Sequence, residues 1–170
     1  MLLLLMTAGC GSVDLEPIGS GRSLTTEALE RTDTLEVSRI KDYEEIRQLE
    51  MDSDLVIVAA VSEDRHLTQL NGTPVTERVV RVLRTLKGDP PAEVVISELG
   101  DGAGALALQP RTTHLLFLTE YELQRGVPTG QFVVTGVYAG DYEQAADGSF
   151  VAVDPESLRL PRTLEKDFSL

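Results

Sequence analysis

Six valine-rich segments of strand length occupy most of the sequence from residue 55 onward, and each is bounded by Gly, Pro, Asn or Asp. Short runs rich in β-branched residues between such turn residues are typical of β-strands. Strands repeated at this spacing indicate a sandwich or a small barrel. The six runs are LVIVAAVSED (55–64), VTERVVRVLRTLKG (75–88), AEVVISELG (92–100), THLLFLTEY (113–121), QFVVTGVYAG (131–140) and GSFVAVD (148–154).

Turn residues between the runs indicate how the strands pair. Asn71-Gly72 separates the first two runs, and Asp147-Gly148 precedes the last one. Both dipeptides accept positive φ and can therefore close antiparallel hairpins. Residues 87–91 read Lys-Gly-Asp-Pro-Pro, a break through which neither a strand nor a helix can continue.

The second run does not alternate cleanly between apolar and polar residues. Val80 and Val82 share one face, whereas Val79 and Leu83 lie on the other. This pattern predicts a bulged or strongly coiled strand that is partly buried on both sides. Strands of this kind are what a small closed barrel needs.

A short amphipathic helix is expected before the first strand, within residues 38–54. Four apolar residues fall three apart and are separated by charges, a spacing that suits a helix better than a strand. They are Ile40, Tyr43, Ile46 and Leu49. Ser38 can serve as the N-cap of this helix. Residues 25–37 remain open between a short helix and an irregular segment.

Composition limits both the architecture and the partners. A chain of 170 residues with 42% hydrophobic content can bury one sizeable core, so one folded domain is expected. The formal charge of −13 repels phosphate backbones, which excludes nucleic acid as a favoured partner. A single cysteine permits neither an intramolecular disulfide nor a zinc site built from cysteines.

That single cysteine, Cys10, follows an apolar run and two small residues. The stretch 2–6 is too short to span a bilayer, and it is typical of an export signal. Thr7-Ala8-Gly9-Cys10 resembles the lipobox of bacterial lipoproteins. The resemblance implies cleavage before Cys10 and attachment of a diacylglyceryl group to its thiol. Thr7 stands where Leu is commonest, and no Lys or Arg precedes the apolar run. The alternative is a cytosolic protein in which Cys10 is a buried apolar residue.

The domain organisation follows from these features. Residues 1–9 are interpreted as the lipoprotein signal peptide, and residues 10–37 as the lipidated cysteine and a flexible tether containing Gly, Ser and Pro. Residues 38–153 form the expected β domain, and residues 154–170 a C-terminal extension.

The β domain also resembles a widespread group of uncharacterised exported bacterial proteins. The resemblance rests on a strand ending in residues 82–88, Val-Leu-Arg-Thr-Leu-Lys-Gly, and on the runs 93–96 and 113–118. Those proteins are distantly similar to the OB-type barrel of netrin and tissue-inhibitor-of-metalloproteinase modules. The fold implied is mainly β, a small five- to six-stranded OB-like barrel preceded by a short amphipathic helix. The cysteines that staple the animal modules are missing, so no inhibitory activity carries over.

Motifs for catalysis or cofactor binding are not found in the sequence. It contains no Gly-x-Ser-x-Gly elbow, no phosphate-binding Gly-rich loop with Lys-Ser/Thr and no His-Glu-x-x-His. The only histidines, His66 and His114, are isolated from each other and are interpreted as structural. Oxygen ligands in the turn formed by Asp141, Glu143, Asp147 and Gly148 do not have EF-hand spacing. No cofactor, metal or catalytic residue is therefore predicted.

Two classes of function remain. The first is a lipoprotein anchored on the extracytoplasmic face of the cell membrane through Cys10, which binds an envelope protein, polymer or small ligand through its loops. The second is an envelope enzyme or inhibitor whose site is assembled from distant residues. The candidates for such a site are His66, His114, Asp101 and Arg111. Convergence of the two histidines with carboxylates would favour the second class.

Overall fold

The computed structural model describes residues 42–70, 72–100, 102, 107–124, 126–154 and 159–170. In this part of the chain one short helix is followed by eight strands. They are α1 (Ile46–Asp52), β1 (Leu55–Leu70), β2 (Thr73–Lys87), β3 (Glu93–Leu99), β4 (Thr113–Gln124), β5 (Val127–Val134), β6 (Asp141–Gln144), β7 (Phe150–Ala152) and β8 (Thr163–Leu164). The expected mainly β fold with a short preceding helix is confirmed.

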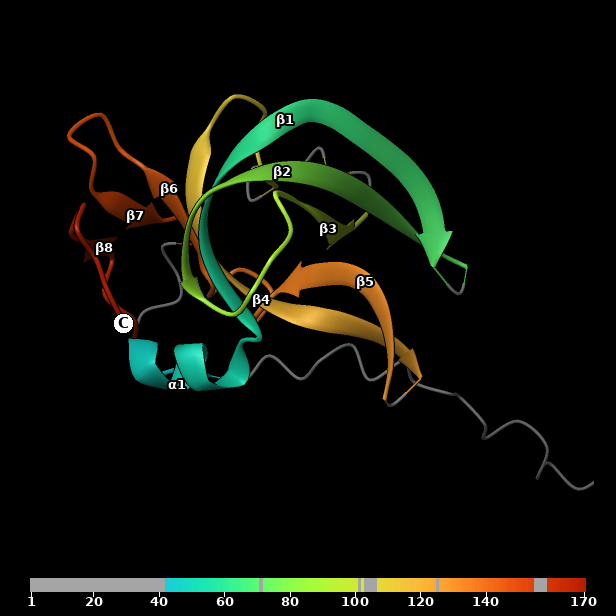
Figure 1. The fold of residues 1–170 in the computed structure, drawn as a ribbon, viewed down its shortest axis with the longest axis horizontal. Coiled ribbons are helices and arrows are strands. Elements are labelled where there is room, and N and C mark those ends of the chain that lie inside the picture. Colours follow the sequence, from blue (N-terminus) through green and yellow to red (C-terminus); the bar gives the residue numbers. More distant parts are fainter. Residues whose placement is uncertain (1–41, 71, 101, 103–106, 125, 155–158) are drawn as a thin grey trace, which may run out of the picture. The chain divides into compact units, whose positions relative to one another are not determined.

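Five of the strands close into a ring in the order β1-β2-β3-β5-β4, and pairing of β4 with β1 completes it (Figure 1). β3 and β5 are parallel, and the other neighbours in the ring are antiparallel. A small Greek-key ring of five strands is the OB-like barrel that the sequence predicted. The predicted hairpins also form, since β1 pairs with β2 across Gly72 and β6 pairs with β7 across Gly148.

The predicted irregularity of the second strand is confirmed in the pairing of β1 with β2. Two register shifts leave Leu86 and Leu83 of β2 without a partner residue on β1. A third shift, between Val61 and Arg65, places the extra residues on β1 instead of β2. Because each bulge adds twist and bends its strand, β1 and β2 can curl far enough for the ring to close.

The described residues form two hydrophobic cores, one inside the ring and one outside it. The barrel core consists of Leu55, Ile57, Ala59, Val61, Val80, Val94, Ile96, Leu108, Leu116 and Leu118. The outer core consists of Tyr43, Leu49, Val56, Val58, Leu115, Phe117, Tyr142, Phe150, Leu160 and Leu164. Alternate residues of β1 and β4 face different cores, and this explains why both strands are continuously apolar in sequence.

Short strands cover the outer core. β6 pairs with β4, β7 with β6, and β8 with β7. Neither β6 nor β8 was among the six expected runs, because four and two residues are too few to show a period. Residues 159–170, assigned from the sequence to a C-terminal extension, contribute Leu160 and Leu164 to the outer core.

The fifth expected run is strand over only part of its length. β5 begins earlier, at Val127, and ends at Val134. Gly136 and Val137 then both have positive φ, 69° and 67°, which turns the chain away from the strand direction. A Cβ at Gly136 would lie 2.7 Å from Cε2 of Tyr43, so the turn also packs closely against the outer core.

The helix is shorter than the sequence predicted. Ser38, the expected N-cap, lies outside the described residues. Residues 42–45 are not helical, so the prediction of a helix that already covers them is wrong. Glu45 is extended, with φ −140° and ψ 144°, and stands as the N-cap. Tyr43 reaches the outer core from the extended chain before the helix, and its hydroxyl contacts Asp52 Oδ2 at 3.1 Å. The apolar residues spaced three apart are therefore not all helical: Tyr43 lies in extended chain, and those that follow it lie in α1.

The Leu-Lys-Gly sequence at the end of β2 contacts the C-terminal end of α1. Lys87 Nζ donates to the carbonyl oxygens of Glu50 at 2.6 Å and Ser53 at 2.7 Å at the C-terminal end of α1, where the Glu50 carbonyl also accepts the backbone N–H of Ser53. Gly88 has φ 83°, and a Cβ there would lie 2.8 Å from the carbonyl oxygen of Asp54. The glycine thus permits the close approach of this turn to the start of β1.

Candidate functional site

On three strands of the ring, an ionisable residue with little solvent exposure stands two positions from a residue of the barrel core. Because side chains two positions apart on a strand face the same side, these residues point toward the barrel interior. They are Arg78 beside Val80 on β2, Glu98 beside Ile96 on β3, and His114 beside Leu116 on β4. β6 adds Asp141, which pairs with Leu116. We call Arg78, Glu98, His114 and Asp141 the interior charge cluster.

Glu98 is the acid at the centre of one half of this cluster. Its Oε2 lies 3.4 Å from Nε of Arg78, and the two side chains are 13% and 4% exposed. Its Oε1 accepts the backbone N–H of Leu108 at 2.8 Å. Burial raises the pKa of Glu98; the Leu108 N–H and the Arg78 guanidinium oppose the rise, and the charge of Asp141 adds to it.

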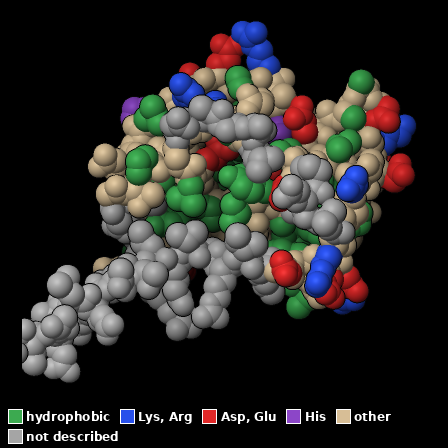
Figure 2. Space-filling model, turned by 180° about the vertical axis from the view of Figure 1, so that it is seen from behind, with side chains coloured by type: hydrophobic (Ala, Val, Ile, Leu, Met, Phe, Trp, Pro, Cys, Tyr) green, Lys and Arg blue, Asp and Glu red, His purple; other side chains and the backbone are tan. Residues whose placement is uncertain are grey.

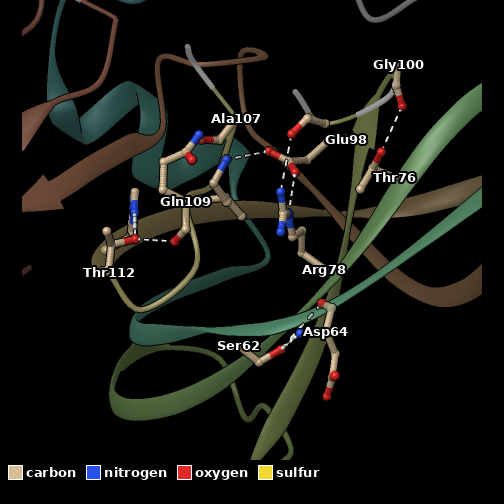
Figure 3. Close-up of polar contacts among 12 residues, drawn as sticks. Ser62, Asp64, Thr76, Arg78, Glu98, Gly100, Ala107, Gln109 and Thr112 are labelled. Carbon is tan, nitrogen blue, oxygen red and sulfur yellow. Dashed lines mark hydrogen bonds and ion pairs between the residues drawn. The ribbon is translucent and has the colours of Figure 1, made fainter. Parts of the chain in front are cut away.

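The connection between β3 and β4 is tied to β2 by further polar contacts. Arg78 Nη2 donates to the carbonyl oxygen of Gly102 at 3.3 Å, and Thr76 Oγ1 donates to that of Gly100 at 3.0 Å (Figure 3). A Cβ at Gly102 would lie 2.8 Å from Cγ2 of Thr76. Glycine at position 102 therefore lets the connection lie directly on the inward face of β2.

His114 is the centre of the other half of the cluster. Its Nδ1 lies 2.6 Å from Oδ1 of Asp141, and both side chains are 2% exposed. Its Nε2 lies 2.8 Å from Oγ1 of Thr112. Thr112 Oγ1 in turn donates to the carbonyl oxygen of Gln109 at 2.5 Å. Figure 3 shows Thr112 and Gln109 side by side at the end of the β3–β4 connection.

A hydroxyl, an imidazole and a carboxylate in this order also occur in enzymes of acyl transfer. There the hydroxyl gives its proton to the imidazole, and the hydroxyl oxygen faces the substrate. Here the Thr112 proton points to the Gln109 carbonyl oxygen, and His114 is almost completely buried. The hydrogen bonds at the two ring nitrogens connect β4 to β6 and to Thr112, and the Thr112 hydroxyl is directed away from the imidazole.

The residues that the sequence put forward for an assembled site do not come together. His66 lies on an exposed part of β1 opposite Glu77, whereas His114 pairs with Ala59 on the same strand. Arg111 is exposed and forms an ion pair with Glu63. Asp101 lies outside the described residues. Of the four candidates, only His114 belongs to the interior charge cluster.

The acidic turn around β6 and β7 is used for internal hydrogen bonds. Asp141 contacts His114, and Asp147 Oδ1 accepts from the backbone N–H and the hydroxyl of Ser149 at 2.9 and 2.6 Å. These two hydrogen bonds lower the pKa of Asp147. Over the residues that the structure describes, no group of three or more His, Cys, Asp or Glu side chains is arranged to hold a metal ion.

Neither a protein-family model nor a curated protein matches this chain. Cys10 and the rest of the expected lipobox lie outside the described residues. No helix within the described ranges is long and apolar enough to cross a bilayer.

Proposed function

We propose that this chain is a bacterial lipoprotein held by acyl chains on Cys10 at the extracytoplasmic face of the cell membrane, with its OB-like barrel serving as a binding module. The observation that carries the anchor is the sequence Thr7-Ala8-Gly9-Cys10 at the end of an apolar run. Two or more acyl chains are needed for stable anchoring, because one chain binds a membrane only marginally.

The barrel supports the binding role. OB folds commonly bind ligands across their second and third strands and the adjoining loops. In this chain Leu67 of β1 and Leu99 of β3 flank β2, opposite Thr76 and Val75 respectively, so the two leucines lie on opposite faces of the sheet. Their side chains are 58% and 59% exposed. In the view of Figure 2, hydrophobic side chains gather in the middle of the face and most charged ones lie nearer its edge. Each leucine offers an apolar contact point for an envelope protein or polymer on its own face of the sheet.

Replacing Cys10 by alanine is expected to abolish acylation and membrane retention. The full sequence with its signal, expressed in a bacterial host, should sediment with membranes and partition into detergent, whereas Cys10→Ala should give no acylated form. Mass spectrometry of the N-terminal peptide should find a wild-type chain that begins at Cys10 and carries a diacylglyceryl group. Ser12→Ala, two residues away, should behave as the wild type. A free Cys10 thiol, or a retained Met1, in the processed protein would contradict the anchor.

A photo-crosslinking amino acid at Leu67 or Leu99 should capture an envelope component in intact cells. The same amino acid at Val151 on β7, which is 41% exposed, is the matched control and should give no product. The crosslinked product should weaken in Cys10→Ala, because the barrel then no longer stays at the membrane. Equal products at all three positions, or none at Leu67 and Leu99, would reject binding through either face of β1–β3.

A further inference from the structure

Beyond Val61, β1 has a neighbouring strand on one side only among the described residues. β4 pairs with β1 from Leu55 to Ala60, and Val61 exchanges backbone hydrogen bonds with residues 111 and 112. β2 continues along the other side as far as the β1–β2 turn. Figure 1 shows this part of β1 at the rim of the fold. A sheet edge of this kind presents unpaired N–H and C=O groups to which a further strand can bind.

The hydrogen bonds of β2 show which residues of this edge point outward. The N–H of Gly100, directly after β3, donates to the carbonyl oxygen of Pro74 at 2.9 Å, so the backbone groups of Pro74 face β3. Because the backbone groups of successive residues in a strand alternate in direction, those of Val75 and Glu77 face β1. The residues of β1 opposite these two are Thr68 and His66.

Three residues of β1 therefore direct their N–H and C=O groups away from β2. They are Arg65, Leu67 and Gln69, and all three are exposed. The pairing with β2 is regular from Arg65 to Leu70, and none of these residues is proline. This edge thus lacks the bulge or proline that commonly prevents a second strand from pairing.

A second copy of the same edge fits these groups in an antiparallel arrangement with a two-fold axis at Leu67. Arg65 then lies opposite Gln69 of the second copy, His66 lies opposite Thr68, and Leu67 meets its own equivalent on the axis. A hydrogen-bonded pair exchanges two hydrogen bonds, so the outward groups of all three residues are used. No like charges lie directly opposite each other, and the Arg65 guanidinium faces an amide oxygen.

Other positions of the two-fold axis fit less well. An axis at Arg65 opposes two guanidinium groups, which is unfavourable. An axis at His66 sets Gln69 against the irregular stretch 62–64, and an axis at Thr68 sets Arg65 against residue 71, beyond the end of β1. An axis at Gln69 likewise sets Leu67 against residue 71. Only the axis at Leu67 pairs the three outward residues with one another.

We propose that two copies of this chain associate through the β1 edge, Arg65–Gln69, and form one continuous antiparallel sheet about a two-fold axis at Leu67. The inference deepens the proposed binding role, because it names a second copy as the component that contacts Leu67, and it does not depend on the lipid anchor. The formal charge of −13 makes the copies repel each other at long range. The attraction therefore comes from the edge itself, and the test is made at about 0.15 M salt, where distant charges are screened.

The first test is disulfide trapping in the full-length chain, kept in detergent with micelles in excess. Cys10→Ala is present throughout, because it removes the only native thiol. Under mild oxidation, Leu67→Cys should give a covalent dimer, since residues opposite each other in an antiparallel pair are within reach of a disulfide. Gln69→Cys should remain largely monomeric, because its two copies lie about 13 Å apart along the strands. A mixture of Gln69→Cys and Arg65→Cys should give the mixed dimer.

Leu99→Cys is the control for random collision, since Leu99 is 59% exposed and lies on β3. It should give little dimer. No dimer with Leu67→Cys, or equal yields with Leu67→Cys, Gln69→Cys and Leu99→Cys, would overturn the proposal. If Leu67 instead photo-crosslinks to a different protein in cells while Leu67→Cys stays monomeric, the binding role stands and the self-association is wrong.

The second test is sedimentation equilibrium of the full-length Cys10→Ala chain under the same conditions. Gln69→Pro removes an outward N–H from each copy and leaves the hydrogen bonds between β1 and β2 in place, so the dissociation constant of the dimer should rise about tenfold or more. Gln69→Ala keeps that N–H and should change the dissociation constant by less than about threefold. Circular dichroism confirms that both variants are folded. A dissociation constant unchanged by Gln69→Pro, or raised equally by Gln69→Ala, would contradict pairing through the backbone of this edge.

Discussion

Replacing Asp141 by alanine is expected to lower the free energy of unfolding by about 1–3 kcal/mol, because it leaves a buried hydrogen-bond donor without its acceptor. Asp141 and His114 are both 2% exposed and 2.6 Å apart. Without the carboxylate, the Nδ1–H of His114 loses its hydrogen-bond acceptor. A loss of this size is a large share of the stability of a typical domain, so urea unfolding measures it directly.

Two variants define the cause of that loss. Asp141→Asn should cost less than Asp141→Ala, because an amide oxygen can still accept the Nδ1–H. Glu143→Ala, on the same strand but exposed, should change the free energy of unfolding by no more than about 0.5 kcal/mol. Equal effects of Asp141→Ala and Glu143→Ala would show that the buried pair contributes nothing to stability.

Replacing Phe117 by alanine is expected to cost about 3–5 kcal/mol through a cavity in the outer core. Phe117 is fully buried, and its ring centroid lies 6.3 Å from that of Tyr142 and 6.4 Å from that of Phe168. Thermal and urea unfolding of the variant measure the loss. Val151→Ala removes an exposed side chain from the same sheet, and its effect should be much smaller. A cost below about 1 kcal/mol for Phe117→Ala would mean that the outer core is loosely packed.

Tyr142→Phe, in the same core, should have the opposite sign. Among the described buried side chains, the Tyr142 hydroxyl is the polar group without a hydrogen-bond partner, so its removal should stabilise the fold by about 1 kcal/mol. Burial raises the pKa of Tyr142 to about 12, compared with 10.0 for an ordinary tyrosine. The wild type should therefore lose stability as pH rises from about 10 to 12, and the loss should be smaller in Tyr142→Phe. Destabilisation by Tyr142→Phe would show that the hydroxyl has a partner in solution.

Local chemistry determined much of the fold. Gly72, Gly88 and Gly148 have positive φ where the sequence predicted turns, because such conformations favour glycine whatever surrounds it. The bulges at Leu83 and Leu86 follow from the interrupted alternation of the second run. The predicted start of the helix was wrong. Apolar residues spaced three apart also arise when an extended residue, here Tyr43, is followed by a shorter helix.

The interior charge cluster could be predicted only in part. Inward alternation places Arg78, Glu98 and His114 on the core-facing side of their strands, and this signal is readable from residues two positions apart. Taken one residue at a time, the sequence led to the interpretation of His114 as an isolated structural histidine. The partnership with Asp141 was missed, because it requires β6, a strand of four residues with no periodic signature.

The sequence by itself determined the strand-forming runs, their turns, the acidic character of the chain and the expectation of a lipid anchor at Cys10. These properties depend on neighbouring residues or on composition, so no knowledge of the fold is needed. Only the tertiary structure decided that β1 meets β4, that β3 and β5 run parallel, and that four ionisable side chains share one buried place. The physical reason is that strand pairing brings together residues far apart along the chain, and the hydrogen bonds and desolvation that define the cluster exist only once the ring has closed.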